Sequence, residues 1–311
     1  MAAGRPPLRT PMFIYISDAT IKNLTVTGYL TSNADYVGGI VGYMKGAATI
    51  DSCEATNLTI TASETFAYIG GICGYSTCDS MTPGTISDCT VSNTTVTGVC
   101  YAGGILGYSS SETVVDITNC KVTGSTINAT RTSGGANAGG VIGYNAYSNS
   151  TVTGCQVSDS TIQADGTIGY SGGIVGYVDA AAADGNCFKI TGNNTVTDCT
   201  ISAEGSSIAY AGGIVGYTEF GDNTHYPNAD ENIHQCQVSG SRTVISANGG
   251  SAYAGGIAGY LYSFGIMNNS ANSMTATASG TTKYAGEIVG KNSGGTAEGN
   301  TASSVTVTPS A

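Results

Sequence analysis

The sequence predicts an all-β protein, a right-handed parallel β-helix or related β-solenoid of about eight coils. Three observations predict this class. A glycine-rich motif returns along the chain, a cysteine-bearing segment lies between its copies, and both are short, β-branched and bounded by turn residues. Each coil of about 33 residues is expected to supply three short strands that pair in parallel with the next coil.

The composition favours one elongated domain and limits its partners. The chain has 311 residues, of which 46 are glycine, 41% are hydrophobic and 10% are charged. A formal net charge of −11 argues against nucleic acid and anionic membranes as partners, because both require basic patches. No run of eighteen apolar residues occurs, so we expect no membrane insertion.

The sequence predicts a short N-terminal segment followed by one long domain. Residues 1–11 are expected to be disordered or foreign to the natural chain, and residues 12–311 to form a single β-solenoid domain. The first residues, MAAGRPPLRTPMFIYIS, lack the apolar stretch of a secretory signal. Because repeats rich in Thr, Ser, Asn and Gly are typical of exported proteins, we expect an extracellular or cell-surface location. Other domains of a longer surface protein, carrying the signal, are then expected.

The glycine motif, as in YAGGIVGY at Tyr210–Tyr217, is predicted to be architectural. Its two glycines permit a tight turn or a close approach of neighbouring coils, and its two aliphatic residues would supply core. The first and last tyrosines are seven positions apart, so a straight strand would point them to opposite faces. Eight copies start at Tyr36, Tyr68, Tyr101, Asn137, Tyr170, Tyr210, Tyr253 and Tyr284.

The cysteine segment predicts an internal file of buried free thiols, because cysteine packs as a small hydrophobe. Vertical disulfides and metal binding remain alternatives. The file comprises Cys53, Cys89, Cys120, Cys155, Cys199 and Cys236, with Ala19, Ser270 and Thr301 expected in the same place near the chain ends. Cys78, Cys100 and Cys187 fall outside it and are the better candidates for reactive or bridged thiols.

The GGIVGY cores, followed by segments such as TISDCTV, resemble the GLUG-motif repeats of bacterial surface adhesins and of the stalks of secreted proteases. The resemblance covers Ile16 to Thr308. It implies a β-solenoid that acts as a scaffold, and no catalytic residue belongs to the motif itself.

Two long links interrupt the repeat, before Cys199 and before Cys236. Because insertions on one face of a solenoid often form its binding surface, we expect recognition there. The second link holds the candidate ligand-binding residues Glu219, Asp222, His225, Tyr226, Asp230 and Glu231. No ligand spacing typical of a metal site occurs among them, and no cofactor is implied.

These features predict a non-catalytic adhesin or spacer rod whose partner is a host glycan, a matrix protein or a surface protein. One alternative is a β-helix enzyme that binds or degrades polysaccharide, with Asp222, Asp230 or Glu231 as carboxylates. A second alternative is ice binding through an array of Thr-x-Thr pairs. These pairs are Thr25/Thr27, Thr59/Thr61, Thr95/Thr97, Thr275/Thr277 and Thr306/Thr308.

Overall fold

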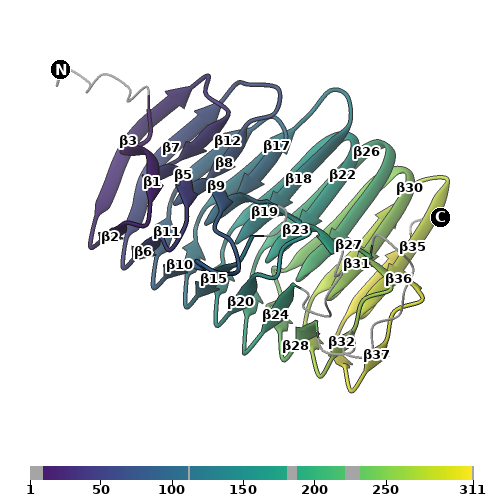
Figure 1. Cartoon of the computed structure of the whole chain (residues 1–311). Coiled ribbons are helices and arrows are strands. Elements are labelled where there is room, and N and C mark those ends of the chain that lie inside the picture. The colour runs from purple at the N-terminus through teal and green to yellow at the C-terminus, as the bar shows by residue number, and fades with distance from the viewer. Residues whose placement is uncertain (1–9, 111–112, 181–187, 221–231, 310–311) are drawn as a thin grey trace.

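The chain forms an all-β parallel solenoid, which confirms the predicted fold class (Figure 1). The structure is a computed structural model that describes residues 10–110, 113–180, 188–220 and 232–309. Successive coils lie side by side, and the two ends of the chain lie at opposite ends of the stack. Strands pair in parallel along three sheets, as in the pairing of Tyr15 with Tyr43.

The first sheet has nine strands and carries the second half of each glycine motif. Its strands are β1 (Phe13–Ser17), β5 (Val41–Lys45), β9 (Cys73–Thr77), β14 (Leu106–Ser109), β19 (Ile142–Ala146), β23 (Val175–Ala180), β27 (Val215–Phe220), β31 (Ala258–Tyr262) and β36 (Val289–Ser293). The second sheet also has nine strands. They are β2 (Thr20–Lys22), β6 (Thr49–Asp51), β10 (Gly84–Ser87), β15 (Val115–Thr118), β20 (Thr151–Thr153), β24 (Lys189–Thr191), β28 (Ile233–His234), β32 (Ile266–Met267) and β37 (Ala297–Glu298).

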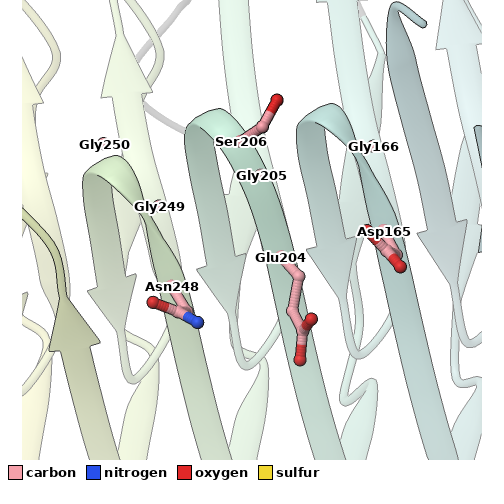
Figure 2. A pocket seen from close by; sticks show the side chains of 8 residues that line it. All are labelled: Asp165, Gly166, Glu204, Gly205, Ser206, Asn248, Gly249 and Gly250. Atoms are coloured by element: carbon pink, nitrogen blue, oxygen red, sulfur yellow. The ribbon is translucent and has the colours of Figure 1, made fainter. Parts of the chain in front are cut away.

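The third sheet has 21 strands, because each coil supplies more than one segment to it. The strands are β3 (Thr25–Ser32), β4 (Tyr36–Gly38), β7 (Glu54–Ala62), β8 (Tyr68–Gly70), β11 (Thr90–Ser92), β12 (Thr95–Gly98), β13 (Tyr101–Gly103), β16 (Lys121–Thr123), β17 (Thr126–Thr130), β18 (Gly135–Gly139), β21 (Gln156–Ser158), β22 (Thr161–Gly172), β25 (Thr195–Thr197), β26 (Thr200–Gly212), β29 (Gln237–Ser239), β30 (Val244–Gly255), β33 (Ser270–Asn272), β34 (Thr275–Ser279), β35 (Thr282–Gly286), β38 (Thr301–Ser303) and β39 (Thr306–Pro309). Strands β22, β26 and β30 each pass through a tight turn, where the ribbon reverses direction (Figure 2).

The first two sheets give nine coils in the described residues, one more than the sequence predicted. The additional coil begins with β1, whose segment FIYIS lacks the glycine pair. Its Phe13 pairs with Val41 and its Tyr15 with Tyr43, so it occupies the motif's place. The three expected pieces also divide differently, since the glycine motif and the cysteine segment each contribute to two sheets.

The glycine motif contains a sharp bend. The amides of Ile40 and Val41 both donate to the carbonyl of Ile72, at 3.1 and 3.0 Å, and the same sharing recurs in the following coils. A Cβ atom on Gly39 would lie 2.2 Å from the carbonyl oxygen of Gly71, so the backbones meet where only glycine fits. The bend lets both adjacent aliphatic residues face the core, whereas a straight strand would alternate them.

The register corrects the predicted cysteine file. Cys53, Cys89, Cys120 and Cys155 follow one another, but the pairing of Gln156 with Thr195 places Asn194 next. Cys199 lies in the following file along the coil, at the place of Ser160. The prediction was wrong because TVTDC at Thr195 resembles TVTGC at Thr151 in sequence, although the two segments occupy different places in their coils. Pairing also puts Leu24, Asn269 and Asn300 in the file instead of Ala19, Ser270 and Thr301.

The cysteines of the segment are buried and free. Each cysteine and asparagine of the file donates to a carbonyl of the preceding coil. Cys120 Sγ donates to the carbonyl of Ile86 at 3.6 Å, and Asn194 Nδ2 donates to that of Val152 at 3.0 Å. Burial raises the pKa of Cys236 to about 12, which keeps this thiol protonated and unreactive.

Two further expectations on side chains change. Cys78 and Cys100 are fully buried and free, so they are core residues rather than reactive or bridged thiols, and Cys187 lies outside the described residues. In the threonine array, Tyr29 and Thr31 pair with Thr59 and Thr61. The expected first row, Thr25/Thr27, is therefore wrong, because an irregularity in the pairing of β3 shifts its register.

Candidate functional site

In six of the glycine motifs, the tyrosines at the two ends contact each other. Ring centroids are 5.1 Å apart for Tyr68 and Tyr75, and 4.7 Å apart for Tyr210 and Tyr217. The expectation of opposite faces fails because the motif bends between its ends. We call the resulting aromatic row the tyrosine ribbon. It comprises Tyr15, Tyr36, Tyr43, Tyr68, Tyr75, Tyr101, Tyr108, Tyr144, Tyr170, Tyr177, Tyr210, Tyr217, Tyr253, Tyr260 and Tyr284.

Neighbouring coils stack their rings within the ribbon. Tyr68 and Tyr101 lie 5.1 Å apart at an interplanar angle of 2°, and Tyr253 and Tyr284 lie 5.5 Å apart at 4°. Such contacts stabilise the stack by about 0.5–1.5 kcal/mol each beyond the area that they bury. Because the rings cover one another's faces, a ligand that approaches the interior of the ribbon meets ring edges and hydroxyl groups.

Two carboxylates stand beside the ribbon on adjacent strands. Asp179 of β23 and Glu219 of β27 are register partners, so they occupy equivalent positions on neighbouring coils. The hydroxyl of Tyr177 donates to Glu219 Oε2 at 2.7 Å, and that of Tyr144 donates to Asp179 Oδ2 at 3.2 Å.

Of the residues predicted from the second long link, the structure describes only Glu219. The others, Asp222, His225, Tyr226, Asp230 and Glu231, lie outside the described residues. Sequence reasoning missed Asp179. A signal for it existed, because Asp179 and Glu219 each follow the last tyrosine of a glycine motif by two positions, in the two coils whose links are long.

Burial dominates the electrostatics of Asp179, which is only 8% exposed. Desolvation raises its pKa, and the neighbouring Glu219 raises it further, while the hydroxyls of Tyr147 and Tyr144 act in the opposite direction. Burial also raises the pKa of Tyr144 and Tyr177, whose hydroxyls therefore stay protonated and act as donors. Within the described ranges, neither carboxylate forms an ion pair, and Asp179 Oδ1 accepts no hydrogen bond.

The site lies where two links leave consecutive coils. Strand β23 ends at Ala180 and β24 begins at Lys189, while β27 ends at Phe220 and β28 begins at Ile233. Both links connect the first sheet to the second. The two links therefore belong to the same corner of consecutive coils. Asp179 and Glu219 lie at the ends of the strands that lead into these links, positions that we call the roots of the links.

An open pocket lies on the tight turns of the third sheet, away from Asp179 and Glu219 (Figure 2). Its volume is about 360 Å³, and its lining includes Asp165, Glu204 and Asn248, which are paired across three coils. Figure 2 shows these side chains following one another along consecutive turns. All three are exposed, so the solvent already satisfies them.

Fold and repeat together define a β-solenoid repeat protein. The model of the GLUG motif matches residues 67–97, and the pairing of the sheets carries the same pattern through the neighbouring coils. Residues 67–97 thus form a GLUG motif, and they lie within a chain of repeats of the same pattern. Searches of curated proteins and of solved structures gave no match.

The described residues contain no helix that is long and apolar enough to cross a membrane. Nor do they bring three or more potential metal ligands of the His, Cys, Asp and Glu types together.

Proposed function

We propose that the chain is a non-catalytic rod of a bacterial cell-surface or secreted protein and that it acts as an adhesin. The observation that carries this proposal is the position of Asp179 and Glu219 at the roots of the two longest links, on consecutive coils. A stack paired along three sheets holds such a corner rigidly outward, as solenoids do when they present a binding surface. The partner is a host glycan or a matrix or surface protein.

An array of glycans and host matrix proteins tests this function. The matched variant replaces residues 181–187 and 221–231 with short links like residues 147–149, which serve the same corner in an earlier coil. Wild-type protein is expected to bind at least one array member, and the short-link variant to bind it at least about tenfold more weakly with unchanged circular dichroism. Silence of the wild type on the array would contradict the adhesin and leave a spacer, and equal binding would place recognition elsewhere.

One observation favours a second candidate, cleavage of a polysaccharide. Asp179 has a raised pKa and faces Glu219 across one strand spacing of about 4.8 Å. Retaining glycosidases use a protonated and an ionised carboxyl about 5–5.5 Å apart. This candidate predicts release of reducing ends from some polysaccharide, lost in Asp179→Asn. No release across a broad panel would sink it.

A further inference from the structure

We propose that Asp179, Glu219 and the adjoining tyrosines form a binding site for a primary ammonium group, supplied by a lysine side chain of a partner polypeptide. The inference deepens the proposed function and rests on it for the role of the partner. It concerns the roots of the two links, for which every atom used below lies in the described residues.

Asp179 carries a buried hydrogen-bond acceptor that no donor among the described residues satisfies. Asp179 is more than nine-tenths buried, and one of its oxygens, Oδ2, receives the hydroxyl of Tyr144. Its other oxygen, Oδ1, is buried as well and has no hydrogen-bond partner in the described part of the chain. A buried polar atom without a partner is costly, so the site is incomplete without a donor.

The groups around Asp179 and Glu219 determine the charge and the hydrogen-bonding character that a ligand must have. Tyr144 and Tyr177 already donate their single hydroxyl protons to Asp179 and Glu219, and the hydroxyl of Tyr147 is a further donor beside Asp179. What they leave for a ligand are oxygen lone pairs, which accept hydrogen bonds but do not donate them. Two adjacent carboxylates and two hydroxyl oxygens therefore require a ligand that is a donor and a cation. A primary ammonium group has a positive charge and three donors.

The tyrosine ribbon already contacts one lysine of the chain itself. In the last coil a lysine, Lys291, takes the place of the second tyrosine of the glycine motif. Its Nζ lies 5.7, 5.6 and 5.3 Å from the ring centroids of Tyr253, Tyr260 and Tyr284. Distances within about 6 Å give a favourable cation–π attraction. The ribbon thus accommodates a lysine stem and its ammonium, which favours a lysine side chain over an amino sugar.

The net negative charge of the chain attracts cationic partners over long range. The chain carries 21 acidic against 10 basic residues, so its field draws cationic partners toward it. At the site itself, ion pairs between the described residues leave both carboxylates free, since the three that occur involve Asp51, Asp159 and Asp198.

The test titrates the full chain with Nα-acetyl-lysine amide and follows tyrosine ring resonances by NMR. The matched ligand is the same compound acetylated at Nε, which removes the charge. We expect shifts at Tyr144 and Tyr177 with the free amine alone. Asp179→Asn and Glu219→Gln are each expected to weaken binding about tenfold, because each removes a charged hydrogen-bond acceptor. The control Asp165→Asn, an exposed acid on the distant turn, is expected to bind as the wild type does.

Several outcomes would overturn the inference. Equal binding of the Nε-acetylated compound would show that the charge is not recognised. Glucosamine binding without lysine binding would assign the site to an amino sugar, and tighter binding of calcium chloride, lost in Asp179→Asn, would make it a metal site. Because Glu219 is only half-buried, Glu219→Gln keeps the test valid if Asp179→Asn fails to fold. Lysine binding with a silent array would overturn the adhesin while the site stands.

Discussion

Cysteine and asparagine share one internal file because both donate a hydrogen bond from a small, buried side chain. The position needs a donor for a carbonyl of the preceding coil, as with Cys120 to Ile86 and Asn194 to Val152. The residue before it adopts a positive φ, 51° at Asp88 and 54° at Asn119, which explains the Asp and Asn that precede the file. The thiol is thus one of two solutions to a backbone requirement.

Substitution of Asn194 tests this account of the file. Asn194 is fully buried, accepts from the Cys155 amide at 2.8 Å and donates to the carbonyls of Val152 and Thr191 at 3.0 and 2.7 Å. Asn194→Ala is expected to lower the free energy of unfolding by about 2–4 kcal/mol, because three bonded groups lose their partner. Asn194→Cys should cost clearly less in urea denaturation. Equal losses for the two variants would refute the shared role.

A pH-dependent prediction follows from Asp179. Its pKa in the folded state is raised above the ordinary 3.8, so folding favours the protonated form. The stability that this gives is present at low pH and is lost as the pH rises through the raised value. Relative to wild type, Asp179→Asn should therefore gain stability between pH 4 and pH 7, by less than about 1 kcal/mol after allowance for solvent screening. Urea midpoints at both pH values measure it, with Asp165→Asn as the exposed control; a constant difference would contradict it.

At the scale of the element, the glycine motif is a bend rather than a loop or a straight strand. Paired glycines allow the backbones of neighbouring coils to meet, as where a Cβ on Gly140 would lie 2.0 Å from the carbonyl oxygen of Gly173. The bend turns two consecutive aliphatic residues inward and brings the flanking tyrosines together, 5.2 Å apart for Tyr101 and Tyr108. One local device therefore builds both the core and the tyrosine ribbon.

Alanine at Gly140 tests the bend. Its new methyl group would meet backbone that cannot move independently, so we expect a loss of about 3 kcal/mol or more in the free energy of unfolding. The matched control is Gly135→Ala, whose Cβ would meet first a ring atom of Tyr170 at 3.2 Å, a side chain that can adjust. Thermal denaturation that shows similar midpoints for both variants would contradict the proposed role of the glycine pair.

At the scale of the whole molecule, the repetition made the architecture predictable. Parallel coils, a buried thiol-bearing core and aliphatic residues facing inward follow from recurring short pieces bounded by turns. Finer assignments failed where local sequence imitates another position, as with Cys199 at the place of Ser160. Of the two carboxylates in the candidate site, the sequence predicted Glu219 but not Asp179. Their pairing depends on the register between coils, which neither segment specifies alone.

The most direct test of the account is the binding of the full chain to the glycan and matrix-protein array before and after neutralising the site. The double variant Asp179→Asn/Glu219→Gln keeps side-chain shape and removes both charges from the roots of the two links. The account predicts that the wild-type signal falls at least about tenfold in the double variant and persists in Asp165→Asn. A signal that survives in the double variant, with folding intact, would contradict the claim that this corner of the solenoid is its recognition site.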